Sequence, residues 1–152
     1  MRTSLLLLSL VCLLLPCQAS AQITPGRVQK RFYDFKAADK EMEYALYVPT
    51  SYDSDKSSPL IVALHGLGSS PSGIMRYPGL TRHAEQFGYL VVAPMGYNSR
   101  GWYGSRGPGG GRRSDPENLG ELSEQDVMNV LRIIRQEFNV NNLRIYLMGH
   151  SM

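Results

Sequence analysis

The chain has 152 residues, 43% of them hydrophobic, and a formal net charge of +3 at pH 7. This charge balance excludes a nucleic-acid-binding surface of the usual kind, which needs clustered basic residues and a much higher isoelectric point. It also excludes an acidic disordered tail. The length suits one small domain.

Residues 1–21 have the pattern of a secretory signal peptide. Arg2 supplies a positive charge, residues 5–15 form an apolar run broken by a single serine, and residues 19–21 are Ala-Ser-Ala, a small-residue cleavage pattern. The run is shorter than the roughly 20 apolar residues that span a bilayer, so no membrane span is expected. We therefore expect a secreted or periplasmic protein, cleaved after Ala21.

Both cysteines lie inside this segment, at Cys12 and Cys17. Lipoprotein attachment at Cys17 is the alternative, but Pro16 stands where such a site takes a small residue. Cleavage after Ala21 removes both cysteines, which leaves no disulfide and no thiolate ligand. Three dispersed histidines do not make a metal-ligand set, so neither a metal nor a cofactor is expected.

Residues 22–31 are polar and contain Pro-Gly, which suggests a loose leader before a domain over residues 32–152. Two strand-like stretches follow over residues 32–49. The clearer one alternates apolar and other side chains over residues 42–48, a period of two that predicts a half-buried antiparallel strand.

Continuous apolar runs then occur at residues 60–64 and 90–93, and residues 143–148 form a third, less pure run that contains Arg144. Short unbroken runs bounded by proline or glycine are typical of strands buried on both faces of a parallel sheet. Helical patterns lie between these runs, and the sequence thus predicts strand–helix–strand–helix–strand, an α/β arrangement with right-handed crossovers.

The first helical pattern covers residues 80–87 and ends at Gly88. The second covers residues 124–138, where apolar residues recur at the spacing of one helix face. Ser123 is the expected N-cap of this second helix, and Asp126 is expected in its first turn, where a carboxylate favours the helix dipole.

Residues 101–111 contain six glycines followed by two arginines. No phosphate-binding glycine motif fits this segment, and it does not directly follow a strand. We interpret it as a surface loop. The aromatic pair Trp102 and Tyr103 inside it either lines a substrate site or, more commonly for such residues, packs the loop.

The last apolar run leads directly into Gly149-His150-Ser151-Met152, the first four residues of G-x-S-x-G. This motif is the nucleophile elbow, a tight strand-to-helix turn that exposes a serine at the carboxyl end of the sheet. Small residues are needed there, which explains Gly149. Ser151 is the candidate nucleophile.

An earlier strand-like run ends in Leu64-His-Gly-Leu-Gly68, a turn whose backbone amides can face the same crevice. Acyl transfer needs two donors for the oxyanion of the tetrahedral intermediate. We expect them to be the amides of Leu67 and Met152. His65 and Gly66 are expected to support the turn, His65 through hydrogen bonds.

Four segments together resemble the α/β-hydrolase superfamily: Tyr44-Ala-Leu-Tyr-Val-Pro49, Pro59-Leu-Ile-Val-Ala-Leu-His-Gly66, Tyr89-Leu-Val-Val-Ala-Pro94 and Arg144-Ile-Tyr-Leu-Met-Gly-His-Ser-Met152. Within the superfamily they resemble secreted esterases of the polyhydroxybutyrate depolymerase and feruloyl esterase type. The resemblance implies the N-terminal part of an α/β-hydrolase sheet, with two antiparallel-type strands and then β-α-β-α-β up to the elbow.

The resemblance also implies a serine hydrolase that acts on a small-molecule or polymeric carboxylic ester through an acyl-enzyme on Ser151. The triad should continue with an acid and then a histidine after the serine. Neither follows Ser151 in these 152 residues. We therefore expect an incomplete domain, and no turnover by this chain alone.

Two alternatives stay open at the level of the sequence. One is a serine peptidase of the prolyl-oligopeptidase kind, which resembles the same segments. The other is a non-catalytic binding protein built on the same fold, which the presence of Ser151 disfavours. No nucleic-acid partner is expected, and nothing in the sequence indicates an oligomeric state.

Overall fold

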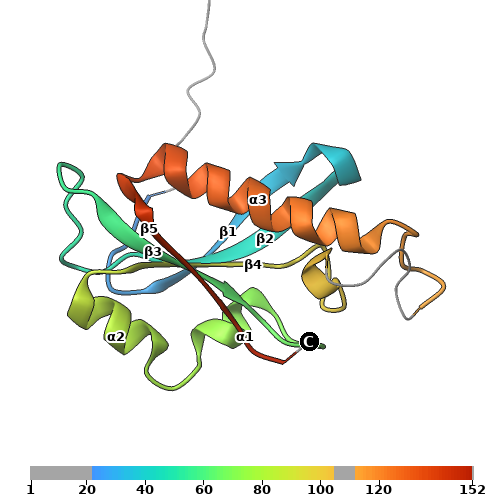
Figure 1. The fold of residues 1–152 in the computed structure, drawn as a ribbon, viewed down its shortest axis with the longest axis horizontal. Coiled ribbons are helices and arrows are strands. Elements are labelled where there is room, and N and C mark those ends of the chain that lie inside the picture. Colours follow the sequence, from blue (N-terminus) through green and yellow to red (C-terminus); the bar gives the residue numbers. More distant parts are fainter. Residues whose placement is uncertain (1–21, 105–111, 152) are drawn as a thin grey trace, which may run out of the picture.

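A computed structural model describes residues 22–104 and 112–151, which form a five-stranded mixed sheet with helices on both faces (Figure 1). The strands are β1 (Val28–Phe35), β2 (Lys40–Tyr47), β3 (Ser58–Leu64), β4 (Leu90–Pro94) and β5 (Val140–Gly149). The helices are α1 (Pro71–Met75), α2 (Leu80–Phe87) and α3 (Leu119–Glu137), with short 3-10 helices η1 (Lys36–Ala38) and η2 (Trp102–Gly104). The predicted α/β class is confirmed.

The strands run in the spatial order β1-β2-β4-β3-β5. β1 pairs with β2, and β2 with β4, in antiparallel fashion, whereas β3 is parallel to both β4 and β5. The prediction of two antiparallel strands followed by a parallel set is therefore confirmed. One boundary differs: β1 begins at Val28, so residues 28–31 of the expected leader belong to the first hairpin, paired with β2.

Two apolar layers hold the helices to the sheet. On one face, Val130 and Ile134 of α3 pack on side chains from β2, β3 and β4. On the other face, Ile74 of α1 and Ala84 of α2 pack on the alternate residues of the same strands. Figure 1 shows α3 above the sheet and α1 and α2 below it. This sandwich explains the continuous apolar runs.

The second layer corrects the prediction of a half-buried strand at residues 42–48. Ala45 and Tyr47 point away from α3, but they are as buried as Leu46, because the helices of the other face cover them. The alternation in the sequence reflects the polar start of β2, where Glu41 and Glu43 face solvent or a partly open surface.

The helix α3 begins five residues earlier than predicted. It follows Asn118, and Leu119 and Leu122 extend its buried stripe toward the N-terminus. Ser123 is therefore not an N-cap, and Asp126 does not lie in the first turn. Both are fully buried in the middle of the helix.

The other helices differ less from expectation. α2 has the predicted bounds and ends at Gly88, whose φ of +69° is the left-handed conformation that glycine adopts readily. α1 was not predicted, because five residues are too few to show a helical period. Ser70 caps α1 by accepting a hydrogen bond from the Gly73 amide at 3.1 Å.

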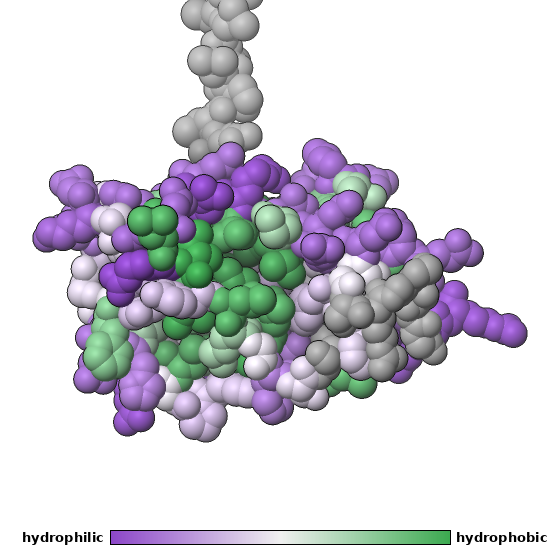
Figure 2. Space-filling view, in the orientation of Figure 1, coloured by the Kyte–Doolittle hydropathy of each residue, from purple (hydrophilic) through white to green (hydrophobic). Residues whose placement is uncertain are grey.

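β5 is the edge strand on the parallel side of the sheet, and much of it is exposed. The exposed fraction is 95% for Leu143 and 71% for Leu147. Figure 2 shows hydrophobic side chains gathered on the face where β5 runs in Figure 1. In the described ranges, no helix is long and apolar enough to cross a membrane.

Candidate active site

The carboxyl ends of β3, β4 and β5 meet at one edge of the sheet, because these three strands are parallel. β3 and β5 stay in register up to the pair Leu64 and Gly149. The His150 amide then donates a hydrogen bond to the Leu64 carbonyl at 3.3 Å. The segments that follow these two strands are therefore neighbours, as expected for a site at the carboxyl edge of an open α/β sheet.

Ser151 follows β5 with a φ of +64°, a left-handed conformation that is uncommon for residues other than glycine. Four of the five such residues in the described ranges lie in the segments after β4 and β5; the set comprises Asp39, Tyr97, Trp102, Tyr103 and Ser151. Strained backbone of this kind concentrates at functional sites. The Ser151 side chain is exposed and makes no hydrogen bond to the described residues.

Gly66 lies directly against this turn. A Cβ atom added at Gly66 would be 2.8 Å from the His150 carbonyl oxygen and 3.2 Å from the Ser151 Cβ. No residue with a side chain fits there without moving the backbone of the turn. By contrast, a Cβ at Gly149 would meet only the Leu64 Cβ at 3.9 Å, an ordinary contact. The close approach thus requires glycine at position 66 more than at position 149.

We call residues 65–68 the oxyanion turn. Its amides have different surroundings: the Gly68 amide donates to the Ser99 carbonyl at 2.9 Å, and the Ser69 amide donates to the Gly66 carbonyl at 3.0 Å. The Leu67 amide donates to no acceptor among the described residues. It is thus available to a ligand. Met152, the other expected donor, lies outside the described residues.

His65 is buried and contacts two carbonyl oxygens. Its Nδ1 lies 2.9 Å from the Gly66 oxygen and its Nε2 lies 2.9 Å from the Met95 oxygen. The Tyr103 ring packs edge-on against the His65 ring at 5.8 Å between centroids. Tyr103 also donates its hydroxyl to the His65 carbonyl at 3.3 Å. The imidazole is therefore enclosed by backbone and aromatic side chains.

The other two histidines are also engaged away from the Ser151 hydroxyl. His83 is exposed on α2 and stacks on Phe87. The His150 ring packs edge-on against Tyr77, whose hydroxyl contacts His150 Nδ1. In the described part of the chain, no His, Cys, Asp and Glu side chains cluster as a metal site would require.

A buried carboxylate, predicted in the first turn of its helix, lies instead against the start of the loop after β4. Asp126 accepts the Tyr33 hydroxyl at 2.5 Å on one oxygen and the Gly96 amide at 2.6 Å on the other. Burial raises the pKa of the Asp126 carboxyl above its usual value, and these donors offset part of that shift. A helical pattern alone could not separate a buried aspartate from a first-turn one.

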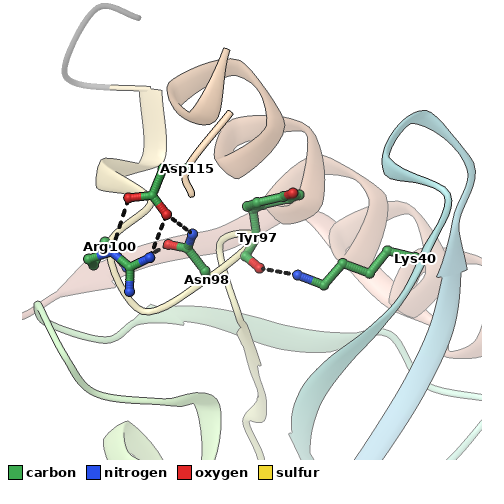
Figure 3. Close-up of polar contacts among 5 residues, drawn as sticks. All are labelled: Lys40, Tyr97, Asn98, Arg100 and Asp115. Carbon is green, nitrogen blue, oxygen red and sulfur yellow. Dashed lines mark hydrogen bonds and ion pairs between the residues drawn. The ribbon is translucent and has the colours of Figure 1, made fainter. Parts of the chain in front are cut away.

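The loop after β4, residues 95–101, is held by a second carboxylate (Figure 3). Arg100 pairs with both oxygens of Asp115, and Asn98 donates to Asp115 at 3.1 Å. The Arg100 guanidinium lowers the pKa of the Asp115 carboxyl. On the other side of the loop, Lys40 donates to the Tyr97 carbonyl at 3.2 Å. The sequence implied no partner for Asp115, since the contacts join distant segments.

Comparison with known proteins finds solved structures with a similar fold. No protein-family model matches the sequence, and no curated protein matches it. Among solved structures, an S-formylglutathione hydrolase from Agrobacterium tumefaciens matches with a TM-score of 0.64 and 20% identity, over 88% of this chain and 52% of that one.

Two further solved structures are similar to the same extent. A ferulic acid esterase from Anaeromyces mucronatus, in complex with ferulic acid, gives a TM-score of 0.61 and 18% identity, over 88% of this chain and 52% of that one. A fluorophosphonate-binding serine hydrolase from Staphylococcus aureus gives a TM-score of 0.60 and 18% identity, over 84% of this chain and 48% of that one.

The chain therefore spans about half the length of the solved structures that it matches. At these identities the likeness establishes the fold alone. The matched structures are serine hydrolases and esterases with the α/β-hydrolase fold, and the five strands correspond to the N-terminal part of their sheet. This chain has the fold of the N-terminal part of an α/β-hydrolase.

Proposed function

We propose that the protein is a serine hydrolase that cleaves carboxylic esters through an acyl-enzyme on Ser151. One observation carries the proposal: Ser151 stands exposed at the carboxyl end of β5 with a φ of +64°, in close contact with Gly66 of the oxyanion turn. A strained, exposed serine beside a turn with an unused amide is what acyl transfer requires.

In the proposed reaction the Ser151 hydroxyl oxygen attacks the carbonyl carbon of the ester. The Leu67 and Met152 amides donate to the oxygen that becomes negative in the tetrahedral intermediate. The serine proton passes to a general base and then to the departing alcohol, and water later hydrolyses the acyl-enzyme. The resemblance implies that the base is a histidine and that an acid orients it.

The proposed substrates are small-molecule or polymeric esters. The Tyr103 ring is packed on His65, so we assign it a role in supporting the turn. Trp102, beside it in η2, is the aromatic side chain that we propose to border the acyl or aryl part of the substrate. No cofactor enters this mechanism.

We also propose that residues 1–21 are a signal peptide and that the protein is secreted or periplasmic. The support is the sequence pattern of a charged start, an apolar run and a small-residue cleavage site. Amino-terminal sequencing of the exported protein should give a chain that starts at Gln22. A chain that keeps Cys17 at its start would instead indicate a lipoprotein.

A fluorophosphonate probe tests the proposed nucleophile. In the full-length protein the probe should label Ser151, and the variant Ser151→Ala should lose both the label and ester hydrolysis. Turnover of aryl esters without turnover of aminoacyl anilides would support the esterase, and the reverse would support the peptidase alternative. A folded full-length protein that is not labelled at Ser151 would support the non-catalytic alternative.

A further inference from the structure

Three of the four buried polar side chains either belong to the oxyanion turn or hold the segments after β4 that contact it. Four polar side chains in the described ranges are buried, and Ser58 is the one that lies elsewhere; the other three are His65, Ser123 and Asp126. Burying such groups costs free energy unless they are hydrogen-bonded, so a shared location indicates a shared task. Two of the three come from the same face of α3.

Asp126 holds the start of the loop after β4. One carboxylate oxygen accepts the Gly96 amide at 2.6 Å and contacts the Tyr97 amide at 3.4 Å. Gly96 and Tyr97 have φ values of +69° and +67°, and the second of these is strained for a tyrosine. A carboxylate that accepts both amides stabilises this unusual pair of conformations.

The residue before this pair contacts the oxyanion turn. The Met95 carbonyl oxygen lies 2.9 Å from His65 Nε2. The opposite ring nitrogen, Nδ1, lies 2.9 Å from the Gly66 carbonyl oxygen. The imidazole thus lies between the loop after β4 and the peptide group that joins Gly66 to Leu67. A neutral ring carries one N–H, so it donates to one of these two oxygens, according to its tautomer, and contacts the other.

The orientation of that peptide group determines where the Leu67 amide points. In a trans peptide the carbonyl and the N–H point in opposite directions, and the described residues contain no cis peptide. The Gly66 carbonyl is directed toward His65 and the Ser69 amide. The Leu67 N–H is therefore directed the other way, where no described residue accepts it.

Ser123 is also linked to His65, through Tyr103. Its hydroxyl oxygen accepts the Tyr103 amide at 3.0 Å. Tyr103 then packs on the His65 ring and donates to the His65 carbonyl. Both buried polar residues of α3 therefore reach His65, each through a segment that follows β4.

We propose that Asp126 is a positioning residue for the oxyanion turn: it fixes the loop after β4 against His65, and His65 in turn fixes the direction of the Leu67 amide. The expected effect of Asp126 on catalysis rests on the proposed function. The structural coupling between Asp126 and residues 65–69 is independent of that function.

The test is the variant Asp126→Asn in the full-length protein. The amide keeps the shape of the side chain but replaces one carboxylate oxygen with an N–H donor, so it cannot accept the same bonds on both sides. We expect kcat for an aryl ester to fall about tenfold with KM changed less than twofold, because an oxyanion donor acts in the transition state. Hydrogen exchange at residues 65–69 should become faster.

Val130→Ala is the matched control. Val130 is buried one turn further along α3 and packs in the core, away from the loop after β4. It should lower the unfolding temperature while kcat and exchange at residues 65–69 stay at wild-type values. Equal effects of the two variants, or wild-type kcat and exchange in Asp126→Asn, would overturn the proposal.

The two readouts separate this proposal from the proposed function. If the wild-type protein neither hydrolyses esters nor reacts with the fluorophosphonate probe, the proposed function fails. Exchange at residues 65–69 in the two variants still decides whether Asp126 positions the turn. Unchanged exchange in Asp126→Asn rejects the positioning role whatever the activity.

Discussion

At the scale of single residues, the contact between Gly66 and Ser151 sets a tight packing requirement at the candidate site. The two residues lie in the turns that follow β3 and β5, and the hydrogen atom of the glycine is all that fits between the two turns. The strained φ of Ser151 adds to the cost of this arrangement. Gly66 therefore cannot take a side chain without a shift of the turn that holds Ser151, whereas Ser151→Ala keeps the Cβ atom that makes the contact.

Gly66→Ala should therefore be much more damaging than Gly149→Ala. The added methyl group at position 66 meets backbone at 2.8 Å, and we expect a loss of about 1–3 kcal/mol in the free energy of unfolding. At position 149 the nearest atom is at 3.9 Å, so the loss should be smaller. Chemical denaturation of the two variants measures the difference, and equal losses would contradict the packing described.

Asp126 should also give the protein a distinctive pH dependence. Burial raises the pKa of its carboxyl, so the folded state binds this proton more tightly than the unfolded state does. Between the usual pKa of 3.8 and the raised value, stability from this group then falls as pH rises. Above the raised value the loss is complete and constant.

The variant Asp126→Asn lacks this titration. The free energy of unfolding of the variant, relative to the wild type, should rise with pH across that window, by at most about 1.4 kcal/mol per pH unit. Asp115, whose pKa is lowered, titrates equally in both proteins and cancels in the difference. If the difference in free energy of unfolding is constant or falls with pH, the pKa of the Asp126 carboxyl is not raised.

At the scale of elements, β5 differs from the other strands. It carries an apolar run like those of β3 and β4, though a less pure one, yet its outer edge has no partner among the described strands and most of its side chains are exposed. The sequence pattern correctly predicted a strand parallel to the others. The exposure of β5 depends on the elements that lie beside it, and the residue pattern of the strand itself carries no information about those neighbours.

An exposed apolar edge strand favours association between chains. Replacing Leu147 with lysine should raise the concentration at which the 152-residue chain associates by about tenfold, roughly 1.4 kcal/mol. Met128→Lys on α3 makes the same charge change at another exposed apolar residue and should have little effect. Light scattering over a concentration series compares them, and equal effects would assign the result to net charge.

At the scale of the whole molecule, local patterns predicted the sheet, α2 and the strand that ends at Gly149. A strand followed by G-x-S is a local signal, and a run of five β-branched or aliphatic residues is another. The bracing of the site was not predictable, because Asp126, Ser123 and Arg100 act through contacts with distant segments. The start of α3 was missed since Ser123 resembled a cap in sequence and is buried in the structure.

The 152-residue chain taken by itself should hydrolyse aryl esters at least about 10⁴-fold more slowly than the full-length protein. Each of its three histidines is engaged elsewhere, so none is placed to take the Ser151 proton. Steady-state assays of the two proteins test this. Turnover by the short chain that Ser151→Ala abolishes would show that one of these histidines is the base.

The pairing of β3 with β5 also has a consequence for folding. The oxyanion turn and Ser151 are far apart in sequence and are joined by a non-local parallel pairing, which forms slowly because loop closure must come first. The proposed reactivity of Ser151 toward the probe would then report the completion of folding. In a refolding experiment, probe labelling of Ser151 should lag behind the appearance of helix, and its rate should follow the closing of β5 onto β3.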